Sequence, residues 1–242
     1  MNPTISSGGL SAFRAQRGFT LVEMLVVIAI IGLLAGMIVP LAQVATRKRN
    51  LARARAEVDN LALAIDTYKA KKGFYPPDNP GHPTTNQLFY ELWGMVLQTT
   101  PVNTANPVFI DTFSANETIA SNLLFQFFGS GGVVNASADT NEIINFIPRI
   151  NAAEIQDINP LYNPKNPPSP TLNTPVWVFA TPAAGPAGGL PIAPSGQAVN
   201  VIRYVCTNPT NNSTTYDLWV DLLIAGQTNR ICNWDKDPEI VH

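Results

Sequence analysis

The chain has 242 residues, of which 45% are apolar, and its formal net charge is −2. Residues 1–55 contain seven of the 15 Lys and Arg residues but one of the 17 Asp and Glu residues, so the rest of the chain is acidic. This length allows one folded domain beyond a terminal segment. General nucleic-acid binding draws its affinity from Lys and Arg that meet phosphates, so an acidic main part argues against a nucleic-acid partner.

Residues 14–49 form a long apolar segment that contains one carboxylate. They read RAQRGFTLVEMLVVIAIIGLLAGMIVPLAQVATRKR, and no side chain from Met24 to Thr46 is charged. About 20 apolar residues are enough to cross the hydrocarbon core of a bilayer. Glu23 lies at the start of this run, where an unpaired charge is costly. We therefore expect Glu23 to meet a positively charged partner.

The sequence GFTLVEML within this segment resembles the processing signal of the type IV pilin superfamily, which includes type II secretion pseudopilins and competence pilins. The resemblance implies that residues 1–18 are a leader ending in Gly18, which a prepilin peptidase removes, and that Phe19 becomes the N-methylated first residue. It also implies that Glu23 neutralises the terminal amine of a neighbouring subunit during filament assembly. A secretory signal peptide or a plain anchor is the alternative, but a conventional cut site follows a shorter apolar run.

The same resemblance predicts where the chain lies in the cell. Residues 19–46 would form a transmembrane and filament-core helix, with the leader in the cytoplasm and the head in the periplasm or outside the cell. The protein would cross the inner membrane once and lie in a filament after assembly. The positive-inside rule favours the opposite orientation, because five basic residues follow the apolar run: Arg47, Lys48, Arg49, Arg53 and Arg55.

The helix is predicted to continue through residues 47–73 as an amphipathic segment. Its apolar residues recur at spacings of three and four, and Gly73 followed by two prolines is a stop signal. A coiled coil is the alternative for this part. The resembled family has a proline matching Pro40, which predicts a local adjustment of the helix during assembly. The residues of the apolar stripe are Leu51, Ala54, Val58, Leu61, Ile65 and Tyr68.

Residues 74–242 are predicted to form a loop-rich head, since they contain 19 of the 21 prolines. Short helices are expected at 84–98 and 117–128. Strands are expected at 176–180, 199–206, 216–223 and 230–234, with an antiparallel hairpin between the second and third of these. The fold class is therefore α+β, a pilin-like fold in which a long N-terminal helix packs on a small antiparallel β-sheet with loop-rich insertions. The segments KGFYPPD and YDLW also resemble the major pseudopilin branch.

The head offers two cysteines and several acidic residues as candidate sites. Cys206 and Cys232 would form one disulfide if adjacent strands bring them together, and two free thiols are the alternative. No metal site is expected, although the resembled pseudopilins hold calcium in a C-terminal loop. The weak calcium candidates here are Asp217, Asp221, Asp235 and Asp237, and the stretch VDLLIAGQTN lacks the acidic, glycine-rich sequence usual in that loop.

These patterns predict a structural role. The chain contains no catalytic motif of the hydrolase, Walker or dinucleotide-binding type, so we do not expect an enzyme. The predicted function is a pilin or pseudopilin subunit of a type IV pilus-like or type II secretion filament. Its expected partners are the prepilin peptidase, further copies of itself, other pilins or secretion-machine membrane proteins, and the membrane. The alternative is a non-polymerising, membrane-anchored binding protein whose exported head captures a ligand.

Overall fold

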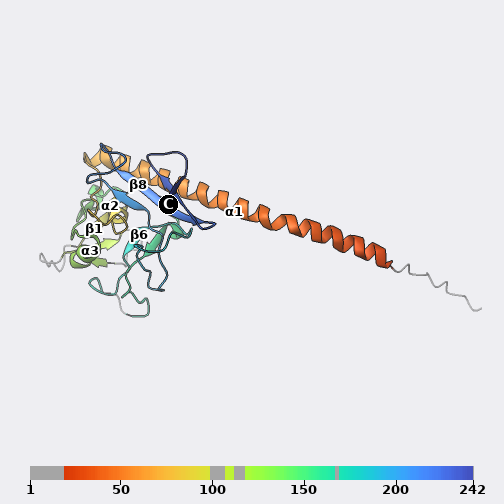
Figure 1. The fold of residues 1–242 in the computed structure, drawn as a ribbon. Coiled ribbons are helices and arrows are strands. Elements are labelled where there is room, and N and C mark those ends of the chain that lie inside the picture. The colour runs from red at the N-terminus through yellow and green to blue at the C-terminus, as the bar shows by residue number, and fades with distance from the viewer. Residues whose placement is uncertain (1–18, 99–106, 112–117, 167–168, 242) are drawn as a thin grey trace, which may run out of the picture. The chain divides into compact units, whose positions relative to one another are not determined.

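The computed structural model describes the chain except for residues 1–18, 99–106, 112–117, 167–168 and 242 (Figure 1). Within the first helix, it describes the backbone but not the side chains of residues 37–41 and 43. The chain divides into two compact units, Met1–Thr46 and Arg47–His242. The first helix, α1 (Leu21–Lys72), contributes residues to both units.

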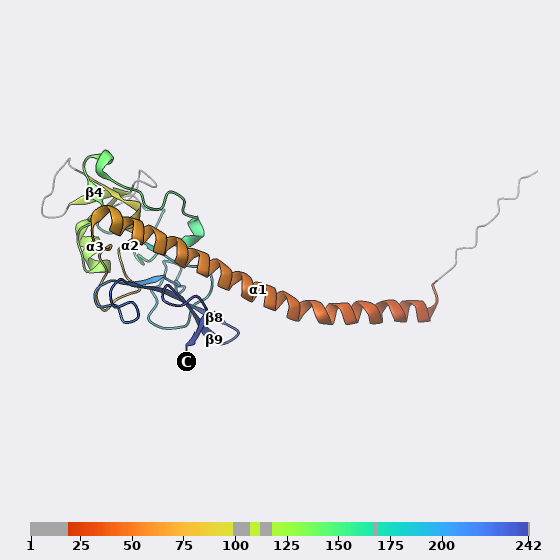
Figure 2. The same ribbon diagram turned by 90° about the horizontal axis from the view of Figure 1, so that it is seen from above.

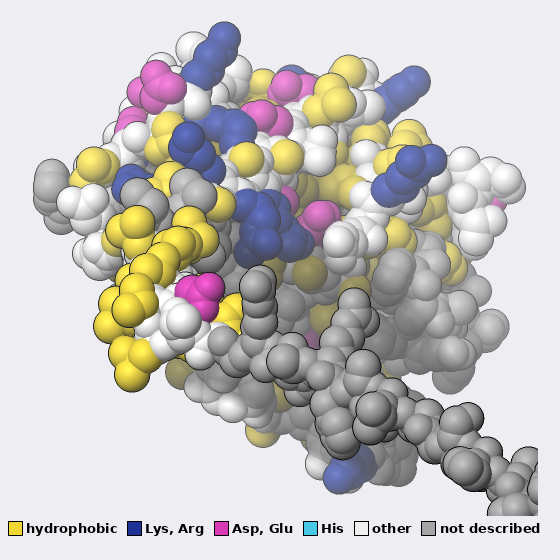
Figure 3. Space-filling view, turned by 90° about the vertical axis from the view of Figure 1, so that its right-hand side faces the viewer, with side chains coloured by type: hydrophobic (Ala, Val, Ile, Leu, Met, Phe, Trp, Pro, Cys, Tyr) yellow, Lys and Arg dark blue, Asp and Glu magenta, His cyan; other side chains and the backbone are white. Residues whose placement is uncertain are grey.

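In the first unit, α1 begins at Leu21 and carries exposed apolar side chains, which gather in the space-filling view (Figure 3). The exposed fractions of these side chains are large, 80% for Leu21, 65% for Ile28 and 67% for Leu33. The described side chains of α1 in this unit therefore form no buried apolar stripe. Over the residues that the structure describes, no helix combines the length and the hydropathy needed to cross a membrane.

In the second unit, the apolar stripe of α1 packs into the core of the head. The predicted stripe is confirmed, since Ala54, Val58, Ile65 and Tyr68 have no exposed surface and Leu61 is 5% exposed. The helix ends where Gly73 adopts a φ of +88°, a conformation that favours glycine, and the amide of Gly73 donates to the carbonyl of Lys69. The predicted stop is therefore confirmed, and the amphipathic half of α1 is the central helix of the head.

The C-terminal sheet has four antiparallel strands in the order β10-β9-β8-β7. It lies beside α1, with β8 and β9 next to the helix in both views (Figures 1 and 2). The predicted hairpin is confirmed, because Arg203 pairs with Trp219 across β7 and β8. The strands are β7 (Arg203–Val205), β8 (Asp217–Ile224), β9 (Gln227–Cys232) and β10 (Glu239–Val241).

The remaining elements gather mainly near the C-terminal end of α1 (Figure 2). A second sheet has the order β3-β2-β1-β4, in which β1 and β4 are parallel and the other pairs antiparallel, and β5 and β6 form a separate antiparallel pair. The elements are α2 (Leu88–Trp93), β1 (Met95–Leu97), β2 (Val108–Asp111), β3 (Thr118–Ala120), α3 (Ser121–Phe128), β4 (Ala136–Ser137), β5 (Ile155–Asp157) and β6 (Trp177–Phe179), with 3₁₀ turns at Thr140–Glu142 and Ala152–Glu154.

The two short predicted helices are shorter in the structure than the sequence indicated. The helix expected at 84–98 ends at Trp93, and β1 follows it directly. Gly94 causes this break because it adopts a φ of +83°, and a β-carbon there would collide with the side chain of Ile143. The helix expected at 117–128 begins at Ser121 and follows β3. Residue 117 lies outside the described residues.

Of the two alternatives for the cysteines, the structure has two free thiols and no disulfide between them. Cys206 follows the end of β7, Cys232 ends β9, and β8 lies between these two strands. Adjacent strands are about 4.8 Å apart, so strands on either side of a third are about 10 Å apart. A disulfide requires Cα atoms within about 7 Å. The sheet order therefore keeps the two thiols apart.

Candidate functional site

The N-terminus of α1 is closed by a reciprocal pair of contacts between Thr20 and Glu23. The backbone amide and the hydroxyl of Thr20 both donate to Glu23 Oε2 at 2.8 Å. In return, the amide of Glu23 donates to the Thr20 hydroxyl oxygen at 3.2 Å. This is a capping box, in which a Thr and a Glu three residues later satisfy amides that the first turn leaves without partners. The sequence Thr-Leu-Val-Glu is the usual signal for it, and our sequence analysis did not use it.

The capping box leaves part of the Glu23 carboxylate available. Both contacts from Thr20 reach Oε2, and no hydrogen bond from the described residues reaches Oε1. Phe19 lies directly before the cap and is 75% exposed. Gly18 lies outside the described residues, as does the side chain of Pro40, although the helix backbone is continuous through residue 40. The structure therefore presents Phe19 and one oxygen of Glu23 to the surroundings.

Basic residues after the first unit have different surroundings. Arg55 donates to the carbonyls of Cys232, Asp235 and Lys236, at 2.6 to 2.8 Å, and so ties α1 to the segment between β9 and β10. Arg53 pairs with Glu57 at 2.8 Å. Lys48 and Arg49 are exposed. The five basic residues of the predicted cluster therefore differ. Arg47, which donates to Asn229 Oδ1 at 3.4 Å, makes a contact with the head as Arg55 does, Arg53 pairs within the helix, and Lys48 and Arg49 are exposed.

The four weak calcium candidates do not converge. Asp217 accepts hydrogen bonds from the backbone amides of Thr210, Asn211 and Asn212 at 2.8 to 2.9 Å, and from the side-chain amide of Asn211. These donors occupy the lone pairs that a cation would need. Among the described residues, no group of three or more His, Cys, Asp and Glu side chains is arranged to hold a metal ion. The loop of residues 210–212 is held by a carboxylate from its own hairpin.

The other calcium candidates have separate roles. Asp221 pairs with Arg230 through two contacts of 2.8 and 3.2 Å, and Arg203 lies 3.7 Å away. Burial lowers the pKa of Arg203, while the hydrogen bond to Asp221 raises that of Arg230. Asp235 accepts the amide of Asp237 in an exposed turn. Asp221 thus stabilises the sheet, and Asp235 stabilises a turn.

We predict that Asp217→Asn lowers the free energy of unfolding by about 2–4 kcal/mol, because an amide group would face donors that now meet a charged acceptor. Chelation with EDTA should leave the thermal midpoint unchanged, since a ligand that holds only the folded state would shift it. Both results are measurable by circular dichroism, with the exposed Asp237→Asn as the control, which should change stability by less than about 0.5 kcal/mol. A lower midpoint in EDTA would show that a metal holds the loop.

The sequence analysis missed a buried carboxylate in α2. Glu91 has no exposed surface and accepts four hydrogen bonds. Burial raises its pKa, and the donors act in the opposite direction. The donors lie on α1, at the residue directly before α2 and in the segment before β4, so that Glu91 joins three parts of the head. An acidic residue between Leu88 and Leu92 on an apolar helix face was the available signal. Its donors are Tyr68 Oη, Gln87 Nε2 and the amides of Val134 and Asn135, at 2.7 to 3.1 Å.

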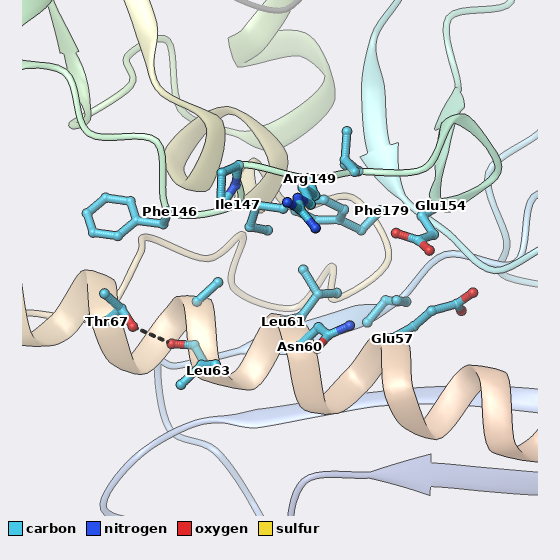
Figure 4. Close-up of a pocket in the computed structure, with 14 residues that line it drawn as sticks. Glu57, Asn60, Leu61, Leu63, Thr67, Phe146, Ile147, Arg149, Glu154 and Phe179 are labelled. Carbon is cyan, nitrogen blue, oxygen red and sulfur yellow. Dashed lines mark hydrogen bonds between the residues drawn. The ribbon is translucent and has the colours of Figure 1, made fainter.

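A mainly apolar cavity of about 350 Å³ lies between α1 and the segment 146–150 (Figure 4). Leu61, Phe146 and Phe179 contribute apolar walls. The carboxylates of Glu57 and Glu154 lie at the same end of it (Figure 4). The Glu57 side chain is 5% exposed, and its Oε2 has no hydrogen-bond partner among the described residues.

The Glu57 carboxyl should make stability depend on pH. Burial raises its pKa above the ordinary value of 4.5, against the lowering effect of Arg53. The folded chain then holds the proton more tightly than the unfolded chain, so this contribution is present below pH 4.5 and is lost as the pH rises through the raised pKa. We predict that Glu57→Gln reduces the fall in stability over that window, measured by urea unfolding at several pH values. An unchanged pH profile would contradict this assignment.

Comparisons with known proteins match part of the chain. Residues 13–39 match the family model of the prokaryotic N-terminal methylation motif. The chain is 40% identical over 76 residues to the type II secretion system core protein G of Pectobacterium carotovorum subsp. carotovorum, which covers 31% of this chain and 48% of the relative. It is 43% identical over 72 residues to the protein of the same name in Escherichia coli K12, covering 30% and 45%. The predicted resemblance to the pilin superfamily is thereby confirmed.

A pilus protein is also similar. The type IV major pilin protein PilE1 of Neisseria gonorrhoeae is 35% identical over 65 residues, which covers 27% of this chain and 30% of the pilin. The chain spans about half the length of the curated relatives it matches, or less. No solved structure matches it.

Proposed function

We propose that this protein is a structural subunit, a pilin or pseudopilin, of a type IV pilus-like or type II secretion filament. The observation that carries the proposal is the match of residues 13–39 to the methylation motif, a range that includes the sequence GFTLVEML with Phe19 and Glu23. Relatives that share 35–43% identity are named as type II secretion core proteins and a major pilin. A prepilin peptidase would cut between Gly18 and Phe19, and Phe19 would be N-methylated.

The geometry of the N-terminus supports the assembly role of Glu23. Its Oε2 closes the helix, while Oε1 has no hydrogen bond from the described residues and remains available for the amine of a neighbouring subunit. A cation next to this carboxylate also lies near the positive end of the helix dipole, so pairing through Oε1 needs the full negative charge of Glu23. Capping and assembly therefore use different oxygens of one side chain.

Anchoring follows from the same segment. Apolar side chains cover the first turns of α1 and are exposed in the first unit, which suits either lipid or the packed core of a filament. The mature protein would cross the inner membrane once, with its leader in the cytoplasm and its head outside, before it enters the filament. Its partners would be the peptidase, copies of itself, and other pilins or membrane proteins of the machine. A catalytic role is not part of the proposal.

The test is the presence of the chain in sheared filaments. We would express the full chain with its own assembly operon, shear the cells, and label the sheared fibres with an antibody to the head for electron microscopy. The proposal expects label along fibres of regular width. The second candidate, a non-polymerising anchored protein with a binding head, rests on the cavities of the head and expects label in the membrane fraction and none on fibres.

A further inference from the structure

Two adjoining cavities form a groove on the head that the proposed function does not use. Their volumes are about 330 and 410 Å³, and both are lined by Gln156, Ala193 and Ser195. We call the two cavities together the β5 groove, because Gln156, one of the three residues that line both, lies on β5. It lies wholly within the second unit.

One wall of the β5 groove is held by hydrogen bonds from β5 and the segments around it. Asp157 pairs with Trp177 across β5 and β6. Asp157 Oδ1 accepts the amides of Asn159 and Val176, at 2.9 and 2.8 Å, which fixes the carboxylate. The amide of Tyr162 donates to the carbonyl of Asn159 and closes a turn that brings Tyr162 to the same wall. Two aromatic rings and one carboxylate are thus placed by ordered backbone.

A tight hairpin also lines the β5 groove. Ile192 pairs with Ala198, the amide of Ala193 donates to the carbonyl of Gln197, and the turn between them contains Ser195. Asn200, which lines the cavity of about 330 Å³, is 5% exposed and donates to the carbonyls of Ala183 and Asp221. Ser195 and Gln197 thus reach the lining from one hairpin.

The chemistry of the lining selects against most ligand classes. Asp157 is the only charged side chain among the described residues that line the groove, so an anionic ligand such as a phosphate would find no cation there. An apolar ligand would leave the amides and hydroxyls of the walls without partners. Uncharged side chains that both donate and accept hydrogen bonds lie among the apolar residues of the lining: Gln156, Thr181, Ser195, Gln197 and Asn200.

We propose that the β5 groove binds a neutral carbohydrate chain. A sugar ring presents hydroxyl groups at its edge, which both donate and accept, and apolar C–H groups on its faces. The side-chain amides of Gln156 and Gln197 can donate to and accept from sugar hydroxyl groups. The rings of Tyr162 and Trp177 can pack against the apolar faces of a sugar.

The test uses the full chain in lipid nanodiscs, because glucoside and maltoside detergents would compete for a sugar site. Maltohexaose, cellohexaose and chitohexaose are the probes, and binding is measured by isothermal titration and by saturation-transfer NMR. We expect saturable binding of at least one hexasaccharide with a Kd below about 1 mM. The double variant Tyr162→Ala/Gln197→Ala should weaken that binding by about tenfold or more.

The control is Phe125→Ala, which removes a 64% exposed aromatic side chain on α3 that does not line the groove. It should leave sugar binding unchanged, and thermal melting should show that all variants remain folded. Gln197→Ala alone serves as a second variant if the double variant does not fold. The proposal fails if no hexasaccharide binds at about 10 mM, if the groove variants bind as tightly as the unaltered chain, or if the groove takes unstructured peptides in place of sugars.

Discussion

Glu23→Ala should remove the protein from filaments while leaving it in the membrane. The variant loses the carboxylate that would neutralise the amine of a neighbouring Phe19 in an apolar filament core, and an unpaired charge in such a place costs about 3–5 kcal/mol. A loss of that size corresponds to a fall of more than about a hundredfold in incorporation. The measurement is the ratio of the protein in sheared filaments to that in membranes, by immunoblot.

Two further variants separate assembly from helix capping. Thr20→Val removes the hydroxyl of the capping box but keeps the carboxylate, and should cost about 1 kcal/mol of helix stability with filaments still present. Glu23→Gln keeps an acceptor for the cap but removes the charge, and should abolish incorporation as alanine does. Normal filaments from Glu23→Gln would show that the carboxylate serves the cap and not the neighbouring amine.

Glu91→Leu should be the most destabilising single change in the head. It leaves the Tyr68 hydroxyl, the Gln87 side-chain amide and the Asn135 backbone amide buried without their acceptor, and the part-buried amide of Val134 loses its acceptor too. Each buried donor without a partner costs about 1–3 kcal/mol, so the total is comparable with the stability of a typical domain. The expected result is a loss of at least about 4 kcal/mol in urea unfolding, or a protein that does not fold.

Milder substitutions test the contribution of the Glu91 hydrogen bonds to stability even if the leucine variant does not fold. Tyr68→Phe removes one donor and should cost about 1–2 kcal/mol, because the ring keeps its packing. Gln87→Ala removes a second donor from the same carboxylate. A folded Glu91→Leu protein within about 1 kcal/mol of the unaltered chain would contradict the role given to this network.

The long helix was predictable because its pattern is long and regular. Six apolar positions at spacings of three and four defined one face of α1, and Gly73 with Pro76 and Pro77 defined its end. The C-terminal hairpin was also predictable, because apolar strands flank a polar, turn-forming loop. In both cases the local pattern extends over enough residues to indicate the type of element without knowledge of tertiary contacts.

The second sheet, with the order β3-β2-β1-β4, was not predictable from local pattern. Its strands have two to four described residues each, and β1 follows α2 after the single residue Gly94. Strands this short carry little alternation, so their pairing depends on tertiary contacts. The sequence left a disulfide and two free thiols open for a related reason, since strand order decides which cysteines meet, and β8 separates them.

Some residues of the candidate sites were predictable from the sequence, and others were not. Phe19 and Glu23 were found through a short motif that the methylation family model also matches. The contact of Glu23 with Thr20 could also have been predicted, because Thr-Leu-Val-Glu has the spacing of a capping box. Glu91 and the β5 groove needed the structure, because their residues come from segments far apart in the sequence.

The most direct test of the central claim is the intact mass and N-terminal residue of the protein recovered from cells that contain its prepilin peptidase. The account predicts a chain that lacks residues 1–18 and begins at Phe19 with one added methyl group. A chain that keeps its leader, or one cut after the apolar segment, would contradict the processing step on which the filament role of Glu23 depends.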